Sequence, residues 1–228
     1  IAACKAELMP SWWLRRLPGG AYLHMARLLG SRGISRRISH YIGHDCLLEQ
    51  LPKPLFITAT DIVSGELVVQ DRGCAVTALM ASMCLPGLAR PIAGEDRILV
   101  DGGVLNNLPG EVLRARGADI VIGVDISGDG ASHGRAKSPG LLKTLSRCWD
   151  LMHTHRREAE RASCDVVIRP QMKSAGFTSF TQVDPFADAG SAAAEAALPI
   201  VQRLIDDFAT AADTDGALPS SVAYYAEI

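Results

Sequence analysis

The alternation of apolar and polar residues between positions 54 and 83 predicts two strands followed by a helix. Residues 54–61 (PLFITATD) are rich in β-branched side chains, a Ser-Gly turn follows, and residues 66–70 (ELVVQ) return as an apolar run. Residues 75–83 (AVTALMASM) have helical apolar spacing, and Pro86 follows as a helix breaker. We therefore expect a hairpin or tight strand pair that leads into a helix.

The next stretch predicts a βαβ unit. Residues 97–101 (RILVD) are typical of a short buried strand, and residues 109–117 (PGEVLRARG) of a helix with Pro109 in its first turn and Gly117 at its end. Residues 118–127 (ADIVIGVDIS) form a second, continuously apolar strand. A strand, a crossover helix and a second strand form a parallel pair, so the expected class is α/β, with a mainly parallel sheet flanked by helices.

The remaining pattern predicts a polar loop, two more helices and one more strand. The loop covers residues 127–140, a helix follows at 138–162, and a strand at 165–170. An alanine-rich helix is expected at 190–212, with Pro199 bending or breaking it. The apolar residues expected along one face of the helix at 138–162 are Leu141, Leu145, Cys148, Trp149 and Met152.

The chain is expected to be one domain, residues 1–228, with no internal repeat. Residues 1–50 have a helical and irregular pattern, residues 51–170 form the α/β core, and residues 171–228 a helical segment. A domain of this size buries roughly 70% of its unfolded surface, so core material is sufficient. Because the first residue is Ile1 rather than Met, we expect the chain to be a piece of a longer protein.

Composition narrows the class of protein. The formal net charge of −2, without long runs of one sign, argues against a nucleic-acid partner, which needs a clustered basic surface. The six cysteines include no CxxC pair, which favours reduced thiols in a cytoplasmic setting over a disulfide framework. No apolar run approaches the roughly 20 residues that a membrane-spanning helix needs.

Asp101 ends a predicted buried strand and precedes two glycines. Burying a carboxylate is costly unless it is paired, hydrogen-bonded or used, and ligands collect at the carboxyl ends of strands in α/β sheets. The glycines remove Cβ atoms where another backbone or a substrate must come close, and they allow a tight turn at positive φ. A turn-forming role and a functional role both stay open on this pattern.

Two short motif pairs stand out in the sequence: ASM followed by LPG, and DGG followed by NNLP. The first pair lies in residues 81–92 and the second in residues 98–127. In order and spacing these two segments and residues 51–69 resemble the C-terminal half of a patatin-like phospholipase domain, in the neuropathy target esterase branch. The resemblance is strong over residues 45–128 and implies a three-layer patatin-like fold.

The resemblance implies a serine hydrolase that cleaves acyl esters of phospholipids or lysophospholipids with a Ser/Asp dyad. The aspartate of the family's DG[AG] motif acts on the serine without a histidine, and the motif corresponds to Asp101, Gly102 and Gly103. A serine hydroxyl is a weak nucleophile until a base takes its proton, and a partly desolvated carboxylate can be that base. No cofactor is implied; the partners are the lipid substrate and, peripherally, a membrane.

The family's nucleophile elbow, GxSxG, and its glycine-rich oxyanion loop precede the DGG motif, and neither is found ahead of Asp101. GASHG at 130–134 contains Ser132, but no strand leads into it and no helix leaves it, so Ser132 is rejected as the nucleophile. We therefore expect the nucleophile-bearing N-terminal part to lie outside this chain. An inactive patatin-fold pseudoenzyme or interaction module is the alternative; a nucleotide-binding domain is disfavoured, because no GxGxxG or Walker loop is present.

Other polar residues have simpler interpretations. Asp61 is expected to form a turn, and Ser82 to pack at a helix end. Asp125 is expected to hydrogen-bond neighbouring strand-end loops, with orientation of the Asp101 loop as the lesser alternative. The histidine groups considered as metal ligands, and rejected for want of a ligand cluster, are His40 and His44 with Asp45 and Cys46, and His153 with His155.

Residues 12–29 mix two tryptophans with three arginines, a composition found in segments at membrane interfaces. An ordinary helix packed over the sheet is the favoured interpretation, because Pro-Gly-Gly shortens any amphipathic face. The membrane interpretation stays open.

Overall fold

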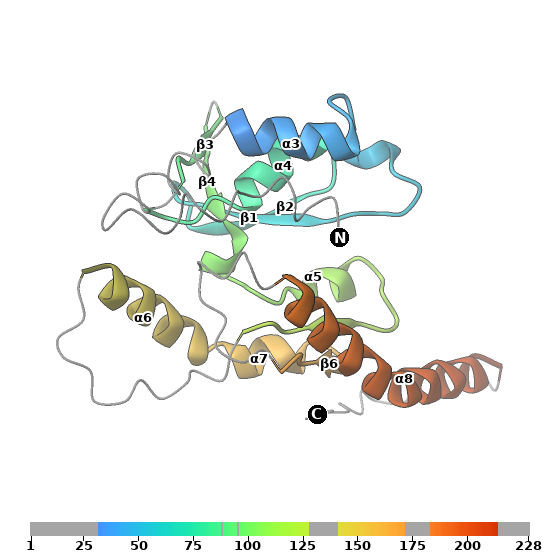
Figure 1. The fold of residues 1–228 in the computed structure, drawn as a ribbon. Helices are drawn as coiled ribbons and strands as arrows, with labels where there is room; N and C mark the ends of the chain where they lie inside the picture. Colours follow the sequence, from blue (N-terminus) through green and yellow to red (C-terminus); the bar gives the residue numbers. More distant parts are fainter. Residues whose placement is uncertain (1–31, 88, 95, 128–140, 172–182, 214–228) are drawn as a thin grey trace. The chain divides into compact units, whose positions relative to one another are not determined.

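The computed structural model describes residues 32–87, 89–94, 96–127, 141–171 and 183–213 (Figure 1). The described residues form two compact units, of which the first ends at Asn107 and the second begins at Leu108. Both units combine helices with strands, so the α/β class is confirmed. The division of the chain into one domain with three segments stays a prediction.

The first unit contains a four-stranded sheet of order β2-β1-β4-β3. Its strands are β1 (Ile57–Asp61), β2 (Glu66–Gln70), β3 (Ile92–Ala93) and β4 (Ile98–Asp101). β1 and β2 pair antiparallel from Ile57↔Gln70 to Asp61↔Glu66, which confirms the predicted hairpin.

The prediction of a mainly parallel sheet is wrong for β4. Its two neighbours, β1 and β3, are both antiparallel to it, so the expected parallel neighbour of this strand is wrong. The physical reason is the short connection from β3, in which the Gly94 N–H donates to the Arg97 carbonyl at 2.9 Å. A hairpin connection of this length can join only antiparallel strands, whereas a parallel pair needs a crossover of a dozen residues or more.

Helices cover one side of this sheet (Figure 1). They are α3 (Arg32–Ile42), the 3₁₀ turn η1 (Leu48–Gln50) and α4 (Ala75–Ser82). α4 packs on β1, and Ala75 and Ala78 form a core cluster with Leu48 and Ile57. Small alanine side chains let the helix lie close to the strand. The helix ends before Met83 and Pro86, as predicted.

Asp61 is a turn former, as predicted, and it also joins the hairpin to β4. Its carboxylate accepts hydrogen bonds from the Val63 N–H (3.0 Å), the Ser64 hydroxyl (3.0 Å) and the Ile98 N–H (3.1 Å). Asp61 is only 3% exposed. The hydrogen bond from Val63 outweighs burial and, with the others, holds the pKa of Asp61 below its ordinary value.

The second unit contains one parallel strand pair. Its elements are α5 (Gly110–Ala115), β5 (Ile122–Val124), α6 (Leu141–Thr154), α7 (Arg157–Ala162), β6 (Val166–Ile168) and α8 (Val183–Asp213). β5 and β6 pair parallel from Ile122↔Val166 to Val124↔Ile168, which confirms both predicted strands. α5 ends before Gly117, whose φ is +87°, as predicted, but Pro109 is its N-cap rather than a residue of its first turn.

The helix predicted at 138–162 is divided into α6 and α7, joined by a turn in which the Arg156 N–H donates to the His153 carbonyl at 3.0 Å. The predicted apolar face is wrong at Cys148, which is exposed, and at Met152, which is 62% exposed. His153 is buried instead; its Nδ1 lies 2.7 Å from the Trp149 carbonyl, and its ring lies against the Trp149 ring.

α8 is one helix of 31 residues that continues through Pro199. Of the two predicted effects of Pro199, breaking the helix is therefore wrong, whereas bending agrees with Figure 1, in which α8 changes direction along its length. A proline removes one intrahelical donor, and neighbouring Ala197 is buried, so packing holds the helix at this level.

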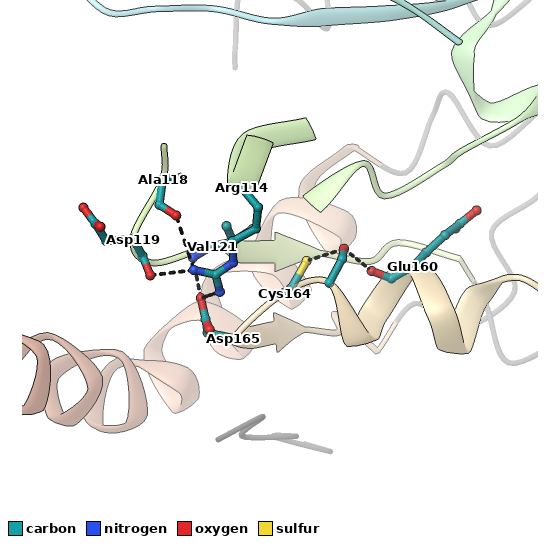
Figure 2. Close-up of polar contacts among 8 residues, drawn as sticks. Arg114, Ala118, Asp119, Val121, Glu160, Cys164 and Asp165 are labelled. Carbon is teal, nitrogen blue, oxygen red and sulfur yellow. Dashed lines mark hydrogen bonds and ion pairs between the residues drawn. The ribbon is translucent and has the colours of Figure 1, made fainter. Parts of the chain in front are cut away.

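An ionic cluster ties α5 to the two parallel strands (Figure 2). Arg114 forms a salt bridge with Asp165 and donates to the carbonyls of Ala118 (3.3 Å) and Asp119 (2.6 Å). The Asp165 carboxylate also accepts the Val121 N–H at 2.6 Å. Because both partners carry several hydrogen bonds, the desolvation cost of this charge pair is offset.

Asp125 follows β5 and has a structural role, as predicted, but the partners of its carboxylate are Ser127, two residues on, and Arg161 of α7 rather than neighbouring strand-end loops. It accepts hydrogen bonds from the Ser127 amide (2.8 Å), the Ser127 hydroxyl and the Arg161 Nε (2.7 Å). Burial by itself would raise the pKa of Asp125, but the Ser127 and Arg161 interactions outweigh it, and the pKa lies below its ordinary value. The ionised carboxylate therefore stabilises the second unit.

This lowered pKa gives a testable pH dependence. A carboxylate with a depressed folded-state pKa contributes stability above its unfolded pKa of about 3.9, and that contribution is lost as pH falls through the folded value. We expect Asp125→Asn to lower the free energy of unfolding at pH 7 by about 1–2 kcal/mol, and the difference from wild type to shrink below about pH 4. Urea titrations at pH 7 and pH 3 measure both; an equal difference at the two pH values would contradict the role of the charge.

Candidate active site

Asp101 is the last residue of β4, where it lies opposite Ala59 of β1. It is also the N-cap of the 3₁₀ turn η2 (Gly102–Val104), and its Oδ1 accepts the Gly103 N–H at 2.8 Å. The turn-forming role is thus confirmed. Asp101 is half-buried, and the hydrogen bond from Gly103 anchors its carboxylate.

A side chain on either glycine after Asp101 would meet close neighbours: the backbone of β1 at Gly102, and two side-chain oxygen atoms at Gly103. A Cβ on Gly102 would lie 2.6 Å from the Thr58 hydroxyl and 2.7 Å from the Thr58 carbonyl oxygen. A Cβ on Gly103 would lie 2.9 Å from Asn107 Oδ1 and 3.1 Å from Asp101 Oδ1. The predicted close approach is confirmed. The predicted positive φ is wrong, because η2 is a right-handed turn and neither glycine has positive φ.

A second segment reaches Asp101 from the end of α4. The Asp101 N–H donates to the Cys84 carbonyl at 3.0 Å, and the Cys84 thiol donates to the Arg90 carbonyl at 2.8 Å. Gly87 turns the chain between them with a φ of +81°. The two most specific pieces of the sequence, ASM with LPG and DGG with NNLP, therefore meet at Asp101.

Cys84 is a neutral neighbour of the Asp101 carboxylate. It is 2% exposed, and burial raises the pKa of its thiol, with the negative charge of Asp101 as a further cause. The thiol therefore stays protonated at neutral pH and adds no second negative charge beside Asp101.

Comparison with known proteins finds relatives over much of the chain. No family model matches the chain. An uncharacterized NTE family protein of Mycobacterium bovis is 32% identical over an alignment of 194 residues, covering 75% of this chain and 33% of that protein. The Rattus norvegicus patatin-like phospholipase domain-containing protein 7 is 35% identical over 101 residues, covering 43% of this chain and 7% of that protein. The chain spans about a third of the length of the mycobacterial relative.

The chain belongs to the NTE branch of the patatin-like family. A second mycobacterial NTE family protein, from Mycobacterium tuberculosis, is 36% identical over 94 residues and covers 41% of this chain and 26% of that protein. The family expected from the DGG and LPG segments is thereby confirmed.

Of the two serines considered, the structure describes Ser82 but not Ser132. Ser82, the last residue of α4, is half-buried, as expected for a residue at a helix end. Ser132 and the GASHG segment lie outside the described residues, and so do residues 12–29.

The structure also describes the histidines considered as metal ligands. His40, His44 and His155 are exposed, whereas His153 contacts Trp149. Within the described ranges, no group of three or more His, Cys, Asp or Glu side chains could hold a metal ion. The five described cysteines, Cys46, Cys74, Cys84, Cys148 and Cys164, are free thiols. In the same ranges, no helix has the length and apolar composition needed to cross a membrane.

Proposed function

We propose that this patatin-like chain contributes Asp101 as the general base of an acyl-ester hydrolase that acts on phospholipids or lysophospholipids. The observation that carries the proposal is the half-buried carboxylate at the end of β4, held by the Gly103 amide at 2.8 Å. A relative named as a patatin-like phospholipase domain-containing protein supports the substrate class. A lipid-ester substrate also implies peripheral contact with a membrane.

In this mechanism Asp101 takes the proton of a serine hydroxyl as the serine oxygen attacks the ester carbonyl carbon. The tetrahedral intermediate then collapses, the acyl-oxygen bond breaks, and the protonated Asp101 returns the proton to the leaving alcohol. Water hydrolyses the acyl-enzyme with Asp101 again as base. The step requires the serine Oγ to approach a carboxylate oxygen to about 2.6–3.2 Å.

We propose that the serine comes from a segment outside these 228 residues. The sequence has no GxSxG ahead of Asp101, and GASHG at 130–134 lacks the strand and helix pattern of a nucleophile elbow. A chain that spans 33% of a relative's length agrees with the C-terminal half of a larger catalytic domain.

A fluorophosphonate probe, which labels activated serines, tests this function in the complete protein that carries the chain. We expect one adduct, on a serine of a GxSxG segment outside the chain, together with hydrolysis of lysophosphatidylcholine. The isolated 228-residue chain should give no adduct. An adduct on Ser132 that is lost in Asp101→Asn would contradict the assignment of the nucleophile. A folded complete protein with neither adduct nor hydrolysis would favour the inactive patatin-fold interaction module.

A further inference from the structure

Cys84 has all of its polar groups engaged, and each bond reaches a different part of the candidate active site. Its N–H donates to the Ala81 carbonyl at 3.1 Å, which continues the end of α4. Its thiol donates to the Arg90 carbonyl at 2.8 Å, and its own carbonyl accepts the Asp101 N–H at 3.0 Å. One buried residue thereby links α4, the turn that contains Gly87, and β4.

The bond to Asp101 matters because the sheet does not hold this residue on both sides. β1 pairs with β4 as far as Ala59↔Asp101. β3 pairs only with the first half of β4, at Ile98 and Leu99, and ends before it reaches Asp101. The Cys84 carbonyl supplies the acceptor for the Asp101 N–H, and so fixes the backbone from which the carboxylate projects.

We propose that Cys84 is a positioning residue for Asp101: its thiol holds the turn that ends at Arg90, and this turn holds the carbonyl that binds the Asp101 N–H. The inference rests on the proposed role of Asp101 as the general base. The thiol itself touches no reacting atom. Its contribution is the orientation of the carboxylate, to which proton transfer is sensitive.

The geometry of the thiol suggests a conservative replacement. The Cβ–O bond of serine is shorter than the Cβ–S bond of cysteine, so a serine hydroxyl would lie somewhat farther from the Arg90 carbonyl oxygen than the 2.8 Å of Sγ, and still within hydrogen-bond distance. Serine at position 84 would therefore keep the hydrogen bond to Arg90 and, like the neutral thiol, would add no charge beside Asp101. Alanine removes the donor and leaves the Arg90 carbonyl without it.

The test compares kcat and KM of the complete protein in four variants, each first checked for folding by its thermal transition. We expect Cys84→Ala to lower kcat by about 10- to 100-fold with little change in KM, and Cys84→Ser to stay within a few-fold of wild type. Cys164→Ala is the matched control, because Cys164 is also a buried thiol but lies in the second unit, and its kcat should be unchanged. Asp101→Asn reports separately on the proposed function.

The outcomes separate the two proposals. If Asp101→Asn loses turnover but folded Cys84→Ala keeps it, the positioning role is overturned and the general base stands. Equal losses in Cys84→Ala and Cys84→Ser would also overturn the role of the hydrogen bond. If Asp101→Asn keeps turnover, both proposals fall. Should Cys84→Ala fail to fold, Cys84→Val removes the donor while filling the space, and the comparison with serine is the same.

Discussion

Asp101→Asn in the complete protein is expected to lower kcat for lysophospholipid hydrolysis by about 10³-fold while the protein stays folded. Asparagine has nearly the same shape as aspartate, and its amide oxygen can still accept the Gly103 N–H that Asp101 Oδ1 accepts at 2.8 Å. It cannot take a proton from a serine. A loss of turnover in Asp101→Asn would therefore report on the missing base and not on a disrupted turn.

The matched control is Asp96→Asn. Asp96 is exposed and lies in the connection between β3 and β4, so this variant makes the same change of charge a few residues away. Turnover and the thermal transition should both stay close to wild type. Near-normal turnover of a folded Asp101→Asn variant would remove Asp101 from the mechanism, whatever the control does.

Where the signal is local, the sequence was sufficient to predict the element. The β1–β2 hairpin follows from two β-branched runs around a Ser-Gly turn, and α5 from Pro109 at its start and Gly117 after its end. Each of these signals lies within a few residues of the element that it predicts. These local signals predict where the strands and the helix lie, and contacts distant in the sequence then stabilise them.

Pairing of β4 was not predictable in the same way. An apolar strand followed by a helix and another apolar strand is the usual pattern of a parallel unit. In this chain the short β3, only two residues long, pairs with β4 through a tight connection and β1 takes its other side. Two residues give no recognisable period in a sequence, so the strand that decides the pairing was overlooked.

The sequence pointed to the residues of the DGG motif in the candidate site, but not to the residues that contact this motif. Asp101 is predicted by a carboxylate at a strand end, and the close approach at Gly102 by the two glycines that follow it. Thr58 and Cys84 were missed, because both meet the DGG turn through contacts distant in the sequence. The LPG and DGG segments were the most specific pieces of the family resemblance, and this co-occurrence was the available signal that they touch.

Gly102→Ala is expected to destabilise the first unit by about 3 kcal/mol and to lower kcat by about 100-fold. A Cβ at this position would lie 2.7 Å from the Thr58 carbonyl oxygen and 2.8 Å from the Thr58 carbonyl carbon. Both are backbone atoms of β1, so no side-chain rotation relieves the overlap. Either β1 or the DGG turn must move, and a displaced turn carries Asp101 away from the serine.

Gly94→Ala provides the comparison for this prediction. Gly94 lies beside β3 in the same sheet, has no positive φ, and its nearest neighbour to a new Cβ is the Arg97 carbonyl at 3.8 Å, an ordinary contact. Denaturant titration and kcat should therefore be close to wild type for Gly94→Ala and strongly affected for Gly102→Ala. If Gly102→Ala were as stable and as active as Gly94→Ala, β1 would have to yield at Thr58 without cost. Tight packing of the DGG turn against β1 could then no longer explain why glycine follows Asp101.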